Sequence, residues 1–465
     1  MKYLLLIFAA LLTAGAQLQA QQQTETGLYF IGFQDKAGTP FSVDRPEEFL
    51  SARALARREK HQATITQEDL PISPDYVNQV LETGAEIWLR SKWMNGVVIL
   101  ANGQQIKEVK KLSFVDTTYY TAPSQYDRSL NYPKIPNLDR PAPKMAHDTV
   151  SRTFYGAGYR NLTRMKGDSL HQMGYRGAGM LVAVLDGGFP MVGYKDFLGY
   201  DDPAAVPANW DVVEQDETAF DGGSHGSTVL STMAAHHPFF FIGMAPEARY
   251  VLFKTENGRG EHRQEEINYA VALEVADSIG VDVANSSLGY TTFNDGDMNY
   301  SYQDMNGRTS PASVAIDNAF ERGMIIVTSA GNSGSDDWKY ISAPADANKS
   351  FSIGALDADD DRAYFSSFGP TADGRIKPDV SAPGVNVPAV ATNGRGLQGA
   401  NGTSLSSPLV CALVTCLWQA FPEATNQEIL DAIRQTAGQA NQPDNTMGYG
   451  LPNFAAAYRR LAQKR

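Results

Sequence analysis

The sequence is poor in cysteine, in net positive charge and in long apolar runs. Two cysteines in 465 residues exclude a disulfide scaffold, and a chain of this length can bury an extensive core without one. Because 52 acidic residues outnumber 39 Lys and Arg, the charge balance argues against nucleic acid or an anionic membrane surface as the main partner. After Leu12 no apolar run approaches the roughly 20 residues that span a bilayer, so we expect no membrane span. A soluble globular protein remains.

The first twenty residues have the pattern of an export signal. Lys2 supplies a positive start, Leu4–Leu12 is apolar but too short to cross a bilayer, and small residues lead up to Ala20. The alternative is a buried N-terminal helix. No Cys follows the apolar run, which argues against a lipid anchor. We therefore expect residues 1–20 to be a signal peptide and the protein to be periplasmic or extracellular.

Residues 21–120 have the pattern of a small α+β domain. We expect strands at 27–33, 85–93, 96–100 and 114–120, and helices at 46–60, from 73 onward and at 105–111. In the first helix, an apolar stripe is expected at Phe49, Ala52, Leu55 and Ala56. Residues 121–152 contain five prolines among polar residues, which is typical of a linker, and we expect a processing site there.

From residue 153 to 465, short apolar strand patterns alternate with helical patterns. Strands are expected at 179–185, 250–254, 281–285, 324–328 and 351–354, and helices at 263–279, 313–323 and 404–421. This alternation predicts an α/β fold with a mostly parallel sheet covered on both faces. Cys411 and Cys416 lie about 140° apart around the last helix and are expected to be buried and unbonded.

Three residues stand where such a fold places its active site, beyond the carboxyl ends of the strands. Asp186 ends an apolar strand pattern, His225 precedes a helical stretch in Gly222-Gly-Ser-His-Gly-Ser-Thr228, and Ser404 begins a helix in Gly402-Thr-Ser-Leu-Ser-Ser-Pro408. A hydroxyl, an imidazole and a carboxylate are what nucleophilic acyl transfer needs. The chain order Asp, His, Ser is that of one of the convergent serine-protease triads.

Asn332 adds a fourth candidate. It lies on the Gly-rich turn Ser329-Ala-Gly-Asn-Ser-Gly334, directly after a predicted strand. Its side-chain amide could donate a hydrogen bond to an oxyanion as charge develops. Each of the four residues taken alone has an ordinary explanation as a turn, surface or helix-capping residue. Their joint occurrence on strand ends, together with an export signal, favours a catalytic site over a binding-only protein.

The resemblance to a known family rests on several motifs in order. They are Val182-Ala-Val-Leu-Asp-Gly-Gly188, Ser224-His-Gly-Ser-Thr-Val229, Asn285-Ser-Ser-Leu-Gly289, Ser329-Ala-Gly-Asn-Ser-Gly334, Lys377-Pro-Asp-Val-Ser-Ala-Pro-Gly384 and Gly402-Thr-Ser-Leu-Ser-Ser-Pro408. Residues 153–465 resemble the subtilisin-like serine proteases of family S8. This resemblance implies a three-layer subtilisin-like fold and a secreted serine endopeptidase acting on polypeptides. The turn after Asp186 and Ser227 depart mildly from the commonest family pattern.

The resemblance also assigns roles. It implies Asp186, His225 and Ser404 as the triad and Asn332 as the oxyanion donor. Ser287, Leu288 and Gly289 would pair with an extended substrate as an added strand. The residues before the linker resemble the inhibitory prodomains of secreted Bacteroidetes-type relatives. The resemblance therefore implies that this prodomain is an intramolecular inhibitor of the peptidase domain.

Four further expectations concern specificity, cofactors, a metal site and a pair of histidines. The resemblance implies that the floor of the P1 pocket lies near Ser342-Ala343, where no charge appears, and this favours uncharged or apolar P1 residues. The chemistry requires no cofactor and no metal. The acidic loop 294–306, with Asp295, Asp297 and Asp304, could hold a structural calcium ion, although a solvated loop is the better interpretation. His236 and His237 are expected to be loop residues.

Overall fold

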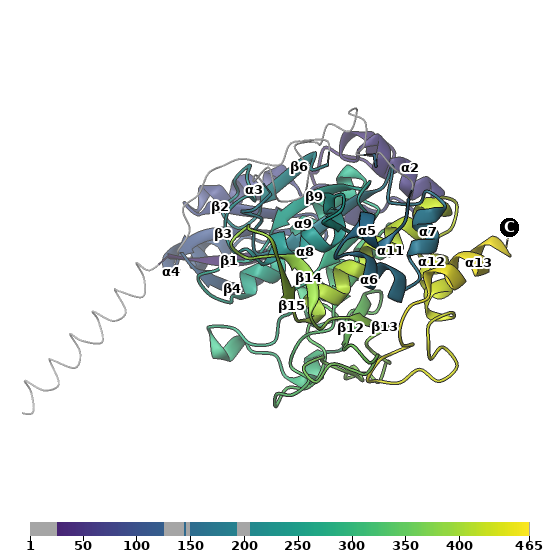
Figure 1. Ribbon diagram of the computed structural model, residues 1–465. Coiled ribbons are helices and arrows are strands. Elements are labelled where there is room, and N and C mark those ends of the chain that lie inside the picture. The colour runs from purple at the N-terminus through teal and green to yellow at the C-terminus, as the bar shows by residue number, and fades with distance from the viewer. Residues whose placement is uncertain (1–25, 125–143, 146–148, 193–204, 465) are drawn as a thin grey trace, which may run out of the picture. The chain divides into compact units, whose positions relative to one another are not determined.

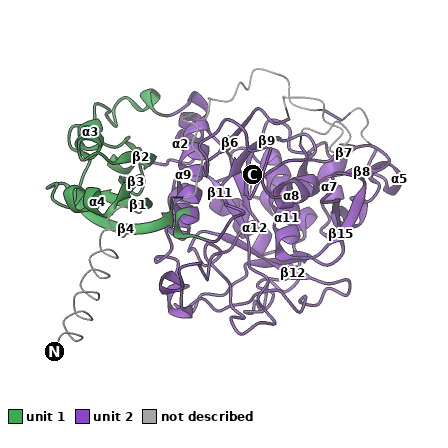
Figure 2. Cartoon of the chain, turned by 90° about the vertical axis from the view of Figure 1, so that its left-hand side faces the viewer, with its two compact units in different colours: residues 1–49, 65–126, 262–264 green, residues 50–64, 127–261, 265–465 purple. Residues whose placement is uncertain are grey.

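The computed structural model describes residues 26–124, 144–145, 149–192 and 205–464 (Figure 1). The expected signal peptide and most of the expected linker lie outside the described residues. The chain divides into two compact units, which Figure 2 colours separately. The first comprises residues 1–49, 65–126 and 262–264, and the second comprises residues 50–64, 127–261 and 265–465.

The first unit contains the predicted α+β domain. Four antiparallel strands pair in the order β2-β3-β1-β4, and two helices supply apolar side chains to the same core. The bounds are β1 Thr26–Phe33, η2 Gln67–Asp69, α3 Pro74–Glu82, β2 Glu86–Ser91, β3 Gly96–Asn102, α4 Gly103–Val109 and β4 Val115–Pro123. All four predicted strands are confirmed. β4 extends three residues into the segment expected to be linker.

Local sequence sets where these helices begin. α3 starts with Pro74 directly after Ser73, a position where the missing N–H of proline costs nothing. α4 begins with a reciprocal cap, because Asn102 accepts from the backbone of Gln105 while the Gln105 side chain accepts from the Asn102 N–H.

The predicted helix over 46–60 is two elements, η1 (Pro46–Glu48) and α2 (Ala52–Lys60), and α2 is capped by Ser51. The expected apolar stripe was wrong. Ala52 and Ala56 are exposed, whereas α2 buries Ala54, Arg57 and Arg58. The pattern misled because the two arginines are paired with a buried carboxylate of the second unit, to which residues 50–64 belong.

The second unit is built on a seven-stranded sheet in which every neighbouring pair is parallel, in the order β13-β12-β11-β10-β5-β9-β6. The strands are β5 Leu181–Asp186, β6 Ala208–Asp211, β9 Arg249–Lys254, β10 Val283–Ser286, β11 Ile325–Ser329, β12 Phe351–Leu356 and β13 Val380–Pro383. Successive residues of β5 are buried, so both faces of the sheet are covered, as the sequence predicted.

Helices α8 (His225–Ala234) and α11 (Thr403–Ala420) pack on one face of this sheet and on each other. The remaining elements are α5 Arg152–Tyr155, α6 Tyr159–Arg164, α7 Asp168–Gln172, β7 His236–His237, β8 Phe241–Ile242, α9 Arg263–Ile279, η3 Gly296–Met298, η4 Tyr302–Asp304, α10 Pro311–Glu321, β14 Val387–Val390, β15 Leu397–Ala400, α12 Asn426–Arg434 and α13 Phe454–Ala462. α11 is long and apolar enough to cross a membrane, but 89% of it is buried in the protein. Cys411 and Cys416 lie within it, buried and unbonded as expected.

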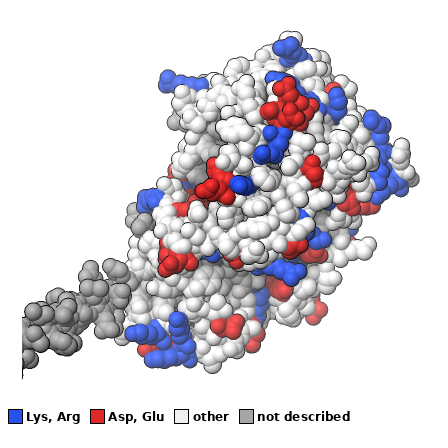
Figure 3. Space-filling view, turned by 90° about the horizontal axis from the view of Figure 1, so that it is seen from below, with Lys and Arg blue, Asp and Glu red and all other residues white. Residues whose placement is uncertain are grey.

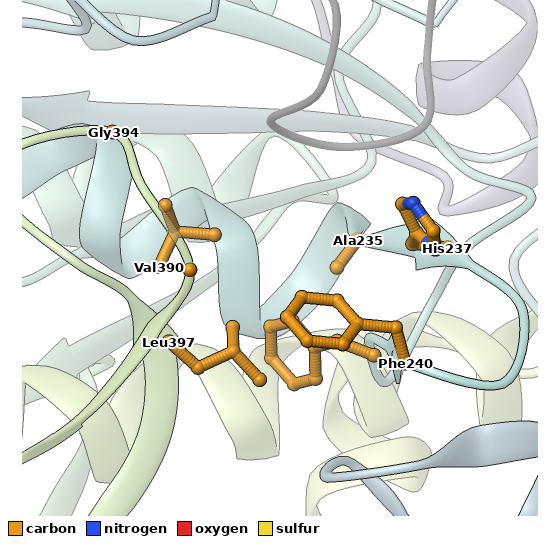
Figure 4. A pocket seen from close by; sticks show the side chains of 8 residues that line it. Ala235, His237, Phe240, Val390, Gly394 and Leu397 are labelled. Atoms are coloured by element: carbon orange, nitrogen blue, oxygen red, sulfur yellow. The ribbon is translucent and has the colours of Figure 1, made fainter.

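His236 and His237 are not loop residues. They form β7, which pairs with β8 in a short hairpin, and this expectation was wrong because a two-residue strand has no readable periodicity. A cavity of about 20 Å³ lies beside the hairpin, where Figure 4 shows Phe240 and Leu397 facing one another. It has room for about one water molecule, and none of the predicted site residues lines it.

Candidate active site

Asp186 and His225 are in direct contact. Asp186 is the last residue of β5 and is 1% exposed, and His225 is the first residue of α8. The imidazole Nδ1 lies 2.9 Å from Oδ1 and 3.0 Å from Oδ2 of the carboxylate. The Gly187 N–H donates to the same Oδ1 at 2.8 Å, so the buried charge is fixed by two donors. The contact holds the proton on Nδ1 and leaves Nε2 as the basic nitrogen.

The electrostatics of this pair follow from burial and charge. The Asp186 carboxylate raises the pKa of His225 above its usual 6.5, and this outweighs the opposing effect of burial. Protonated His225 therefore stabilises the folded chain below pH 6.5, and this stabilisation is lost as the pH rises through the raised pKa. To act as a base, His225 must be in the neutral form.

Ser404 lies in the first turn of α11 and is 8% exposed. Its hydroxyl donates to the Ser287 carbonyl at 3.4 Å, and the Ser287 hydroxyl donates to the Ser404 carbonyl at 2.9 Å. The candidate nucleophile is therefore tied to the segment that follows β10. Gly402 precedes the helix with φ 144°, a conformation that favours glycine.

Asn332 faces the start of the same helix. Its Oδ1 accepts from the Thr403 backbone N–H at 2.9 Å and from the Thr403 hydroxyl at 3.0 Å. These two donors fix the orientation of the amide and leave Nδ2 as its donor group. A Cβ placed on Gly402 would lie 3.5 Å from this Nδ2, so the space beside the donor is kept free of side chain.

The predicted substrate segment Ser287–Gly289 follows β10 and is outside any strand. A Cβ on Gly289 would come within 2.4 Å of the Ser342 hydroxyl, so a larger residue here would have to displace that hydroxyl. Ser342 and Ala343 are both buried and uncharged. Ala343 accepts from the Tyr290 N–H at 2.6 Å, which places the expected P1 floor beside the end of this segment.

Sequence reasoning did not assign roles to three residues that support the site. Ser407 donates to Asn285 Oδ1 at 2.8 Å, and the Asn285 amide donates to the Ser287 hydroxyl at 3.2 Å. Thr403 orients Asn332 as described above. All three lie inside motifs that the sequence analysis singled out, so the signal was present, but the side-chain pairing across 71 to 122 residues of sequence was not readable.

The acidic loop 294–306 does not gather its carboxylates. Asp295 accepts from the Asp297 N–H and Asp304 from the Ser301 N–H and hydroxyl, so these side chains cap local turns. In the part of the chain that the structure describes, the groups with carboxylate oxygens within 4.8 Å of one another are Asp211, Glu214 and Asp221, and Glu256, Glu261 and Glu265.

Either acidic group could hold a cation, and the surroundings of the two groups differ. In the first, the Lys254 ammonium binds Asp211 at 2.7 Å and Asp221 at 2.8 Å, so a cation is already supplied by the chain. In the second, burial and then the Glu261 carboxylate raise the pKa of Glu256 to about 8. Burial likewise raises the pKa of Glu261 to about 7, and the Glu266 carboxylate adds to the rise. On the surface, Figure 3 shows acidic and basic side chains intermixed over the face it draws.

A buried carboxylate that orients an imidazole, a hydroxyl at the start of a helix and an oriented amide after a strand are the groups that a serine hydrolase on an α/β sheet uses. Comparison with known proteins makes this specific. The Subtilase family (Peptidase S8) matches residues 177–450, and a Bacteroidota Peptidase S8 propeptide domain matches residues 28–135. The chain belongs to the subtilase family, the subtilisin-type serine endopeptidases, as the motifs predicted.

Individual relatives point to the same family. Subtilisin NAT of Bacillus subtilis subsp. natto is 27% identical over 381 residues, which cover 81% of this chain and 84% of that protein. The M-protease of Shouchella clausii is 31% identical over 64% of this chain and 69% of its own length. Fervidolysin from Fervidobacterium pennivorans, a keratinolytic enzyme related to subtilisin, has a similar fold, with a TM-score of 0.61 and 22% identity. That alignment covers 93% of this chain and 61% of fervidolysin.

The raised pKa of His225 predicts the acid side of the pH profile. We expect kcat/KM to increase with pH with an apparent pKa above 6.5, because only neutral His225 can accept a proton. In Asp186→Asn, the increase should move to lower pH and the rate should fall by about 10⁴-fold, since the amide no longer fixes the correct tautomer. Rates on a chromogenic peptide between pH 5 and about 9 measure both effects. Profiles with the same inflection in both proteins would contradict the assignment.

Asn332→Leu tests the oriented amide. Removing one oxyanion donor lowers kcat by about 10²–10³-fold, a magnitude known from a subtilisin, and KM should change little. The reason is that the donor acts on charge present in the transition state and not in the bound substrate. A rise in KM with kcat unchanged would instead make Asn332 a substrate-binding residue.

Proposed function

We propose that this chain is the proenzyme of an exported serine endopeptidase that uses Ser404, His225, Asp186 and Asn332. The observation that carries the proposal is the contact of Asp186 with His225 Nδ1 at 2.9 and 3.0 Å, at the carboxyl end of a central strand of a subtilase fold. The apolar segment at residues 4–12 supports export.

The proposed chemistry is the acyl transfer that a triad of this order performs. Ser404 Oγ attacks the scissile carbonyl carbon while its proton passes to His225 Nε2. Asp186 stabilises the imidazolium that forms, and Asn332 Nδ2 donates to the oxyanion. His225 gives the proton to the departing amine, which leaves an acyl-enzyme on Ser404. Water, activated by His225, hydrolyses the ester and restores the hydroxyl.

The substrate is an extended polypeptide. Ser287–Gly289 continues beyond β10 outside any strand, and it is the segment that would pair with the substrate as an added strand. The Ser287 hydroxyl contact with the Ser404 carbonyl sets this segment against the nucleophile.

The N-terminal region acts as an intramolecular inhibitor that is removed during maturation. Two observations support this: the propeptide-domain match over residues 28–135, and a separate apolar core formed by the first unit. We propose residues 21–120 as the inhibitory domain, 121–152 as the linker that contains the processing site and 153–465 as the peptidase domain.

The Ser404→Ala full chain tests nucleophile and maturation together. It should accumulate as an unprocessed proenzyme without protease activity, whereas the native chain gives a shorter form that reacts with a fluorophosphonate probe. The variant should remain folded, because Ser404 makes no helix cap and its 3.4 Å hydrogen bond contributes at most about 1 kcal/mol. Gel mobility, casein cleavage and probe labelling are the measurements.

The outcomes separate the alternatives. Loss of activity with normal processing would mean that another protease matures the chain. Activity retained in Ser404→Ala would remove Ser404 as the nucleophile. Activity absent from the native mature form would favour a binding-only protein.

The uncharged pocket floor predicts specificity. We expect a peptide library to be cleaved mainly after uncharged P1 residues, because Ser342 and Ala343 offer no charge to pair with a substrate side chain. Sequencing the cleaved peptides gives the P1 distribution. Cleavage chiefly after Arg or Asp would show that a charged group elsewhere reaches the P1 side chain.

A further inference from the structure

Helix α2 belongs to the propeptide domain by sequence, but it packs with the peptidase domain. The propeptide-domain match over residues 28–135 includes it, whereas residues 50–64 pack as part of the second unit, with the subtilase domain. The contacts of α2 explain why this part of the propeptide packs with the peptidase domain.

Two adjacent arginines of α2 share one buried carboxylate. Arg57 binds Asp277 Oδ1 at 2.5 Å and Arg58 binds Oδ2 at 2.6 Å. All three side chains are at most 4% exposed. A buried carboxylate held by two guanidinium groups is a strong and directional contact, and removing either partner leaves a buried charge uncompensated.

Arg57 also caps the ends of two peptidase helices. Its guanidinium donates to the Asp277 carbonyl at 3.2 Å and to the Val281 carbonyl near the end of α9, and its Nε donates to the Arg322 carbonyl at 3.1 Å just after α10. The last carbonyls of a helix have no partner within the helix and carry its negative dipole end, so a cation is favourable there.

The two helix ends are also shaped to admit α2. Gly280 and Gly323 follow α9 and α10 with φ of 88° at each. A Cβ on Gly280 would come within 2.8 Å of the Ala54 nitrogen, and one on Gly323 within 2.8 Å of the His61 ring. Positive φ and close approach both call for glycine at these positions.

We propose that the Asp277 surface of the peptidase domain is a docking site for a helix presenting two adjacent arginines, and that its occupant, residues 50–64, keeps the cleaved prosegment bound. Cleavage within residues 121–152 breaks none of the contacts of α2, so processing alone does not release the prosegment. The proposal rests on the proposed inhibitory role and names the anchor through which that inhibition persists after cleavage.

The test uses the full chain with Ser404→Ala and a recognition sequence for a foreign site-specific protease placed within residues 128–140. After cutting, surface plasmon resonance on the C-terminally tethered peptidase domain gives the rate at which the N-terminal fragment dissociates. Arg57→Met with Arg58→Met should increase this rate about 100-fold or more, because Asp277 is left buried without a cation. Arg45→Met is the matched control, since Arg45 pairs with Glu48 while 54% exposed, and it should dissociate like the reference.

Two further variants guard against a folding defect, which thermal unfolding of the uncut chains would reveal. Arg57→Lys with Arg58→Lys keeps both charges but loses the forked geometry and should dissociate at an intermediate rate. Asp277→Asn removes the carboxylate from the opposite side and should accelerate dissociation like the Met pair. Equal dissociation rates in the reference, the Met pair and Asp277→Asn would overturn the proposal.

A separate measurement, of casein cleavage, tests the inhibitory role itself. With Ser404 restored, a cut chain that retains its N-terminal fragment and still cleaves casein would leave the anchor intact and remove the inhibition. A cut chain that is inhibited, but that loses the fragment equally fast in every variant, would support the inhibition and overturn the anchor.

Discussion

The site depends on one constraint, the parallel register of the central strands. β5 pairs in register with β9 on one side and β10 on the other, so their carboxyl ends reach the same edge of the sheet. That edge receives Asp186 from β5, Ser287 from the segment after β10 and Asn332 from the turn after β11. Because these positions are fixed by backbone pairing, the sheet supplies three of the groups and the starts of α8 and α11 supply His225 and Ser404.

The contact between Asp186 and His225 has opposite consequences for stability and for activity. It raises the pKa of His225, so the protonated pair contributes most to folding at low pH, where the imidazole cannot act as a base. In the proposed mechanism, His225 starts neutral and becomes an imidazolium only when it takes the proton of Ser404. That imidazolium is the same species that Asp186 stabilises at acid pH, so the contact would lower the barrier.

Much of the fold was predictable because its signals are local. The apolar runs ending at Asp186 and before Asn332 showed the strands, and α9 was predicted with its observed bounds, Arg263–Ile279. The site residues could be named because each lies in a short motif at a strand or helix end. What could not be predicted is the pairing between motifs. The link from Ser407 through Asn285 to Ser287 joins side chains 122 residues apart, and no periodicity encodes that distance.

The failure at α2 shows the limit of hydrophobic patterning most directly. A helix with Arg57 and Arg58 on one side is expected to turn that side to water, because an unpaired buried charge is prohibitively costly. The cost disappears when Asp277, about 220 residues later in the chain, offers one oxygen to each arginine and two helix ends offer their carbonyls. A surface built from buried charge and helix-end carbonyls discriminates strongly between partners, since a helix without the two arginines would leave Asp277 desolvated and unpaired. Such a surface suits a peptidase that must bind one segment of its own chain and treat other polypeptides as substrates.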